Sequence, residues 1–155
     1  MARRHTLTPN DRAFIMQIAQ EVRNERRGCV RGWCLPASIR LADRLRRLGY
    51  PARRGWGFLL TDGEFEGEWG GDSPIIWADD DPTVQRDMPH NWVTVDNLLI
   101  DITAEQFNRV IRGEQFPPVY LTTIDSASRY IPGDIFESEP DDIASAPKAW
   151  KYGKK

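Results

Sequence analysis

Three residues, Cys34, His90 and Asp101, are of the types that form a thiol nucleophile with its base and an orienting acid. Cys34 follows a turn-forming Gly-Trp pair and stands immediately before a segment with helical spacing. The unpaired N–H groups and positive dipole end of a helix N-terminus favour a thiolate over a thiol. Cys29, in the irregular link before this helix, has no such support. The pattern predicts nucleophilic attack by Cys34, with His90 as the base.

His90 and Asp101 can cooperate only if they share one face of a β-hairpin. If Asp96 and Asn97 form a two-residue turn, Trp92 pairs with Asp101. Side chains alternate along a strand, so His90 then lies on the same face as Asp101, one diagonal away. The carboxylate there could accept the imidazole N–H, fix its tautomer and favour the imidazolium. A turn of odd length would place the two side chains on opposite faces.

Each of these residues also has a purely structural interpretation. A cysteine before a helix is commonly a small buried apolar residue, and a strand histidine is commonly a satisfied polar group. Asp101 could cap the short helix that follows it. A further interpretation treats Cys29 and Cys34 as a redox pair, which predicts equal effects of mutating either one. The conjunction of a helix-starting cysteine, a strand histidine and a neighbouring aspartate favours catalysis.

Two helices are predicted to precede the sheet. The first lies within residues 7–28, where Thr8 can cap, Pro9 suits the first turn and Gly28 ends it. The second spans about 35–48 and ends at Gly49. Their apolar stripes consist of Phe14, Ile15, Ile18, Ala19 and Val22 in the first helix and Leu35, Ile39, Ala42 and Leu45 in the second.

The remainder of the chain alternates strand-like and loop-like segments. Residues 62–89, rich in Asp, Gly, Glu and Pro, predict a long surface loop. Strands are expected at 56–61, 91–95, 98–103 and 118–124, with one more within the loop at 73–78 and a short helix at 104–111. Helices followed by an antiparallel sheet indicate an α+β fold. We expect one domain over 1–131 and a Pro-, Asp- and Lys-rich extension or tail over 132–155.

The composition is that of a folded globular protein: 155 residues, of which 40% are hydrophobic. No window approaches the length of a membrane span, and the N-terminus lacks the apolar stretch of a secretory signal. Two cysteines make no disulfide framework, which favours a cytoplasmic location. Their C-x4-C spacing, far from either histidine, predicts no metal site, and no cofactor is expected.

The net charge of −2 conceals an uneven distribution. Residues 1–54 hold thirteen Lys/Arg against four Asp/Glu, and residues 55–155 hold eight against nineteen. One interpretation is a basic patch for nucleic acid or an acidic partner. The other is that the arginines line solvated helix faces, and the absence of nucleic-acid-binding motifs favours it. The arginines concerned are Arg23, Arg26, Arg40, Arg44 and Arg47.

Two stretches, 32–58 ("GWCLPASIRLADRLRRLGYPARRGWGF") and 90–107 ("HNWVTVDNLLIDITAEQF"), resemble the transglutaminase-like branch of the papain-like cysteine hydrolases. The first also resembles the leader peptidases of lasso-peptide maturation. The resemblance implies a papain-like core, in which helices, with the nucleophile at the start of the second, pack on an antiparallel sheet. It also implies that Cys34 is the nucleophile, His90 the general base and Asp101 the orienting acid.

The chain departs from the family pattern in its oxyanion hole. No glutamine upstream of Cys34 is clearly placed as a side-chain donor, and Trp33 occupies the position before the cysteine. The backbone N–H of Cys34 can supply one donor. The candidates for the second donor and for the cleft around it are Trp33, Asn91, Trp92 and Gln106.

The expected function is hydrolysis or acyl transfer at an amide of a peptide or protein, through a thioester. Peptidase, deamidase and transamidase activities share this first half-reaction. Trp69 and Trp77 of the 62–89 loop could line or cover the cleft, or the loop could be a solvated insertion. The rival function is a non-catalytic binding module of the same fold, whose basic helices contact an acidic protein or, less expected, nucleic acid.

Overall fold

A computed structural model describes residues 7–26, 30, 32–65, 74–78 and 84–133. Two helices precede the strands, which confirms the α+β class. The helices are α1 (Pro9–Asn24) and α2 (Cys34–Arg47), with 3-10 helices η1 (Ala104–Val110) and η2 (Ile124–Ser126). The strands are β1 (Ala52–Thr61), β2 (Gly63–Phe65), β3 (Ile75–Trp77), β4 (Arg86–Val95), β5 (Leu98–Asp101), β6 (Tyr120–Thr123) and β7 (Tyr130–Pro132).

Helix α1 begins where the sequence predicts. The Thr8 hydroxyl accepts a hydrogen bond from the Asp11 backbone N–H at 3.1 Å, and the Asp11 carboxylate accepts one from the Thr8 N–H at 2.8 Å. This reciprocal capping box satisfies two N–H groups that a helix leaves unpaired, and Pro9 occupies the first turn. The predicted stop at Gly28 lies outside the described residues.

Helix α2 begins at Cys34 itself. Trp33 is the N-cap and makes no side-chain capping hydrogen bond. No capping side chain therefore accepts a hydrogen bond from the backbone N–H groups of the first turn. The helix ends before Gly49, as predicted, where a φ of +94° turns the chain back toward the sheet. The Tyr50 N–H then bonds to the Leu45 carbonyl at 3.0 Å.

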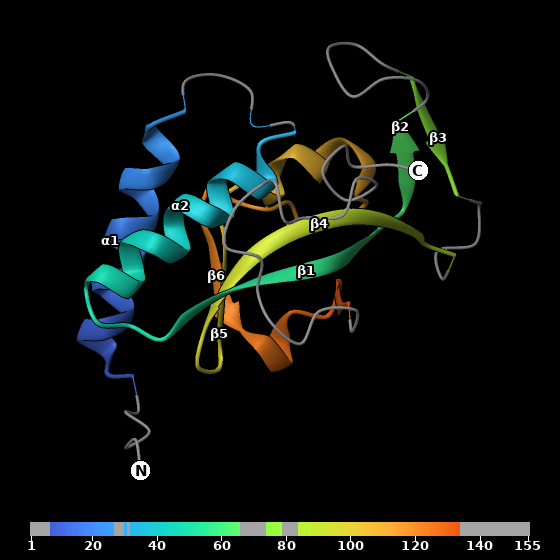
Figure 1. Cartoon of the computed structure of the whole chain (residues 1–155). Helices are drawn as coiled ribbons and strands as arrows, with labels where there is room; N and C mark the ends of the chain where they lie inside the picture. Colours follow the sequence, from blue (N-terminus) through green and yellow to red (C-terminus); the bar gives the residue numbers. More distant parts are fainter. Residues whose placement is uncertain (1–6, 27–29, 31, 66–73, 79–83, 134–155) are drawn as a thin grey trace.

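Five strands form one antiparallel sheet in the order β6-β5-β4-β1-β7, and β2 and β3 form a separate hairpin. Figure 1 shows α2 lying across the long β1–β4 pair, with α1 packed beside α2 and the β2–β3 hairpin at the far end of the pair. Strand β4 pairs with β1 over ten residues and with β5 over only three. The first half of β4 therefore extends beyond the β5 ladder, and α2 begins near this region.

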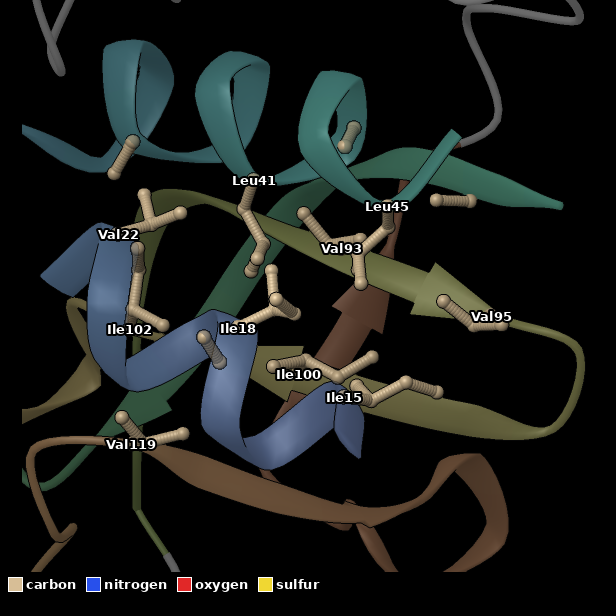
Figure 2. Close-up of a cluster of buried hydrophobic side chains, with 14 of the residues drawn as sticks. Ile15, Ile18, Val22, Leu41, Leu45, Val93, Val95, Ile100, Ile102 and Val119 are labelled. Atoms are coloured by element: carbon tan, nitrogen blue, oxygen red, sulfur yellow. The ribbon is translucent and has the colours of Figure 1, made fainter. Parts of the chain in front are cut away.

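The main hydrophobic core fills the space between the helices and the sheet. In Figure 2, the labelled side chains of α1 and α2 meet those of β4 and β5 in a single layer. These contacts are made by Ile15, Ile18, Val22, Leu41, Leu45, Val93, Val95, Ile100 and Ile102. A second cluster, which includes none of the residues of α1 or α2, contains Leu59, Met88, Trp92, Leu99, Phe107, Val110 and Tyr130. The sheet is thus buried on both faces.

The predicted long loop at 62–89 is wrong in part. Residues 63–65 form β2, and β4 begins at Arg86 rather than at Asn91. These polar residues become a strand because they pair with the end of β1, from Thr61↔Arg86 to Gly57↔His90. The strand expected at 73–78 is confirmed as β3, Ile75–Trp77.

The two tryptophans of this loop, which could line the cleft or belong to a solvated insertion, have different outcomes. Trp77 lies on β3 and is 41% exposed, with the Arg112 guanidinium 4.7 Å from the centre of its ring. Trp69 lies outside the described residues. Strand β7, which pairs with β1 at Gly57–Leu59, was not predicted and extends to Pro132, where we expected a tail to begin.

We predict that Gly55→Ala destabilises the fold. Gly55 faces Trp92 across the β1–β4 ladder, and a Cβ at position 55 would lie 2.1 Å from the indole Nε1. Overpacking of this kind lowers the free energy of unfolding by about 1–3 kcal/mol, which urea denaturation would measure. In a Trp92→Leu background the same change should cost much less, since the ring that clashes is gone. An equal cost in both backgrounds would contradict this contact as the cause.

Candidate active site

The hairpin that carries His90 and Asp101 has the predicted register. Asp96 and Asn97 form a two-residue turn, Val95 pairs with Leu98, and Asp96 has a φ of +51°. Positive φ is what a tight two-residue hairpin turn demands, and aspartate is among the residues that tolerate it. The even turn length puts His90 and Asp101 on one face, as required for their contact.

His90 and Asp101 form a fully buried pair. The imidazole Nε2 lies 2.5 Å from the Asp101 Oδ2, and the two side chains are 0% and 1% exposed. Asp101 also accepts hydrogen bonds from the Thr103 backbone N–H at 2.9 Å, the Thr103 hydroxyl at 3.3 Å and the Tyr130 hydroxyl at 2.7 Å. Four donors around one carboxyl group favour the charged carboxylate, which fixes the ring orientation of His90.

Cys34 is a partly exposed free thiol at the first position of α2. Its Sγ accepts a hydrogen bond from the Asn91 Nδ2 at 3.5 Å. The second ring nitrogen of His90, Nδ1, is buried and makes no hydrogen bond of ordinary geometry to the described residues. With Nε2 committed to Asp101, Nδ1 is the nitrogen available to take the thiol proton.

The electrostatics of the three groups favour an ion pair. Burial raises the pKa of the Cys34 thiol, but its interaction with His90, joined by the Asn91 amide, outweighs burial and holds that pKa below its ordinary value. Burial lowers the pKa of His90, but Asp101 and then Cys34 overcome it and raise the pKa to about 10. Despite the opposing effect of burial, contact with His90 lowers the pKa of Asp101. These directions favour a Cys34 thiolate paired with a His90 imidazolium, which the Asp101 carboxylate stabilises.

Aromatic rings enclose the imidazole of His90. Phe107 of η1 meets it edge-on with ring centres 4.8 Å apart, and Trp92 and Tyr130 lie at 6.1 and 6.3 Å. Trp92 is itself buried and packs against Tyr130 and the bare backbone of Gly55. Trp92, one of the four oxyanion and cleft candidates, therefore packs beside His90 on the same face of β4.

Gln106 and Trp33 hold the chain around Cys34 in place. The Gln106 Nε2 donates to the Thr103 carbonyl at 2.8 Å, and its Oε1 accepts from the Gly32 N–H at 3.4 Å. Gln106 therefore links η1 to the turn that precedes the cysteine. The Trp33 ring is buried in the main core, with the Arg26 guanidinium 5.7 Å from its centre. Asn91 differs from both, because its side chain reaches the cysteine sulfur itself.

Sequence reasoning missed Tyr130, which completes the environment of Asp101. It lies on the short strand β7, 29 residues beyond Asp101, in a segment with no strand periodicity. No spacing rule connects the two positions. The only signal in the sequence was a tyrosine shortly before the expected tail.

Most of the arginines in the predicted basic patch pair with carboxylates of the same chain. Arg44 contacts Glu21 at 3.4 Å and Glu25 at 3.2 Å, which joins α2 to α1. Further pairs are Arg40–Glu25, Arg47–Asp43 and Arg23–Glu105, the last of which joins α1 to η1. This pairing favours the interpretation that the arginines line helix faces.

No helix among the described residues is long and apolar enough to cross a membrane. Within the same part of the chain, no three His, Cys, Asp or Glu side chains are grouped so as to hold a metal ion. Comparison with known proteins gives no match to a family model, a curated protein or a solved structure.

We predict that Tyr130→Phe lowers the free energy of unfolding by about 1.5–3 kcal/mol at neutral pH, because a buried hydrogen bond to a charged group is lost. The pKa of Asp101 is lowered in the folded state, so this contribution is present above the unfolded-state pKa of aspartate. The deficit should shrink as the pH falls through the titration of Asp101.

Urea denaturation of both proteins across pH measures the Tyr130 effect. Tyr120→Phe is the matched control, because that ring stacks on Tyr130 with centres 6.0 Å apart. It removes a hydroxyl for which no bond to Asp101 is seen. A Tyr130→Phe deficit that is independent of pH would show that the hydroxyl does not act through the carboxylate.

Proposed function

We propose that the chain is a cysteine hydrolase or acyltransferase that attacks an amide carbonyl through a Cys34–His90–Asp101 triad. The observation that carries this proposal is the buried His90–Asp101 pair beside a thiol at a helix N-terminus. Burying an imidazole with a carboxylate costs free energy because it desolvates two ionisable groups, so such a pair indicates a functional role. Its position beside the thiol supplies that use.

The triad would act in two half-reactions. The Cys34 thiolate attacks the carbonyl carbon, and the resulting oxyanion is bound by the Cys34 backbone N–H. The His90 imidazolium gives its Nδ1 proton to the amide nitrogen, the C–N bond breaks, and an amine leaves a thioester on Cys34. His90 then takes a proton from water, which attacks the thioester and releases a carboxylic acid. An amine in place of water gives a new amide.

The resemblance to the transglutaminase-like branch supports a peptide or protein amide as the substrate. It also supports a papain-like core for the arrangement of α2, β4 and β5. A catalytic thiol has to remain reduced, which favours a cytoplasmic setting for this enzyme. Peptidase, deamidase and transamidase activities differ only in the amine that leaves and in the nucleophile that resolves the thioester.

The rival function, a binding module that uses its basic helices, would need those arginines for a partner. Their pairing with Glu21, Glu25, Asp43 and Glu105 makes them less available for such contacts. Cys34→Ala separates the two functions, because only the enzyme depends on the thiol. Charge reversal at Arg44 and Arg47 would abolish the activity of a binding module while Cys34→Ala left it intact.

The proposed first half-reaction can be tested with p-nitrophenyl acetate as an acyl donor. We expect a burst of p-nitrophenol and an acetyl adduct on Cys34 in the intact mass of acid-quenched protein. The adduct should be absent in Cys34→Ala and retained in Cys29→Ser, the matched cysteine control. Adding a small primary amine then shows whether water or the amine resolves the thioester. Absence of the adduct, or an equal amount in Cys34→Ala, would overturn the proposal.

A further inference from the structure

We propose that the side-chain amide of Asn91 is the second oxyanion donor of this site, opposite the backbone N–H of Cys34. The inference rests on the proposed function, because an oxyanion forms only if Cys34 attacks a carbonyl. It assigns a second donor to a chain in which no glutamine is clearly placed before the cysteine to supply one.

Asn91 approaches the sulfur from a fixed position on the sheet. It follows His90 on β4 and pairs with Trp56 of β1 within the ten-residue ladder. Because side chains alternate, Asn91 shares the face of Val93, which packs against the helices, whereas His90 points to the other face. The base and the amide therefore come from neighbouring residues on opposite faces of the same strand. The thiol interacts with both.

The contact of the Asn91 amide is with a reacting atom. Its Nδ2 donates to the Cys34 Sγ at 3.5 Å, and the side chain is 2% exposed. When the sulfur attacks a carbonyl carbon, the oxyanion lies one bond beyond that carbon, within reach of a donor already beside the sulfur. The Cys34 N–H, in the first turn of α2, provides the other donor. Two such donors make an oxyanion hole.

The other end of the Asn91 amide shows that stability does not explain the residue. Its Oδ1 is buried and has no hydrogen-bond partner among the described residues. An unsatisfied buried polar group costs about 1–3 kcal/mol, and an apolar residue of the same shape would avoid that cost. Gln106, by contrast, uses both its amide oxygen and its nitrogen in positioning contacts. The Asn91 amide therefore lowers the stability of the fold, and a role of its N–H in catalysis explains why an amide is found there.

The test compares two reactions of Cys34 that differ in whether an oxyanion forms. Acylation by p-nitrophenyl acetate passes through an oxyanion, whereas alkylation by iodoacetamide needs only the thiolate. We expect Asn91→Ala to slow acylation by about 10²–10³-fold, the usual cost of losing one oxyanion donor. Alkylation should slow by less than about tenfold, the cost of one hydrogen bond to the sulfur.

Asn91→Leu is the second variant, because it keeps the approximate shape of asparagine and removes the unsatisfied Oδ1. It should unfold at the same temperature as the wild type or higher and should show the same selective loss of acylation. Asn10→Ala, at an exposed asparagine of α1, is the matched control and should change neither rate.

The outcomes separate this inference from the proposed function. A wild type that acylates, with Asn91 variants that acylate equally fast, overturns only the assignment of Asn91. Equal losses of acylation and alkylation also overturn it, because Asn91 would then act on the thiolate alone. A wild type that is alkylated quickly but is never acylated overturns the proposed function and the oxyanion role together.

Discussion

Replacing His90 by alanine is expected to slow the acylation of Cys34 by about 10³-fold at neutral pH. The variant removes the general base and the positive charge that lowers the pKa of the thiol. Burial and the Asp101 charge, which oppose the thiolate, are then countered only by the Asn91 amide, so the thiol pKa rises. Stopped-flow measurement of p-nitrophenol release and the mass of the acyl adduct give the rate and its site.

The control for His90 is the other histidine of the chain. His5→Ala removes an imidazole from a position that the sequence places outside the predicted helices and strands, and it should leave acylation unchanged. Circular dichroism should show that His90→Ala retains its fold, since Asp101 keeps three of its hydrogen bonds, those from Thr103 and Tyr130. A folded His90→Ala protein that acylates at the wild-type rate would exclude His90 as the base.

Replacing Asp101 by asparagine is expected to slow acylation by up to about 10⁴-fold, the scale seen when the orienting acid of a triad loses its charge. An asparagine amide can donate to Nε2, which leaves the proton on Nδ1, the nitrogen that has to accept one from Cys34. Loss of the carboxylate charge also lowers the pKa of His90 from about 10. The pH dependence of acylation measures both effects.

Asp62 offers a matched control for the Asp101 substitution. It is also buried and accepts hydrogen bonds from the Arg112 N–H at 2.7 Å and the Arg129 guanidinium at 3.1 Å. Asp62→Asn should lower the free energy of unfolding without changing the reactivity of Cys34. If the two variants lost acylation in proportion to their loss of stability, the effect of Asp101 would be structural.

The part of the site that depends on local rules could be predicted from the sequence. An even-length turn fixes the faces of a hairpin, so Asp96 and Asn97 sufficed to place His90 and Asp101 together. Helical spacing and the following Gly49 bounded α2 closely enough to put Cys34 at its start. The helix-face interpretation of the arginines followed from the predicted helices and from the absence of nucleic-acid-binding motifs in the sequence. Most of the ion pairs connect α1 and α2 or lie within α2.

The parts of the structure that depend on tertiary pairing could not be predicted from the sequence. The start of β4 contains Arg86, Asp87 and Pro89, residue types that are uncommon in a central strand. Proline is tolerated because this portion of β4 lies beyond the residues paired with β5, so β1 is its only ladder partner among the described strands. Strand β7 is short and lies at the sheet edge, so no periodicity revealed it or its Tyr130.

The sequence likewise did not distinguish among the four oxyanion and cleft candidates, whereas the structure does. Trp33 adjoins Cys34 as Asn91 adjoins His90, and Trp92 and Gln106 lie only two and five residues from a member of the triad. Burial and hydrogen bonding distinguish them: two rings pack in the cores, and Gln106 positions the turn before Cys34. Only the structure shows an amide nitrogen at the sulfur with an unsatisfied oxygen behind it.

The pH dependence of Cys34 alkylation is the most direct test of the thiolate–imidazolium pair. In a Cys29→Ser background, we expect the rate of iodoacetamide alkylation to reach its plateau at a lower pH than for an ordinary thiol, because the pKa of Cys34 is lowered. Amide cleavage should also decline above a pH of about 10, where His90 loses its proton, whereas alkylation persists. An alkylation rate that rises in a single step near the ordinary thiol pKa of about 8.5, unchanged in His90→Ala, would contradict the ion pair and the proposed function that depends on it.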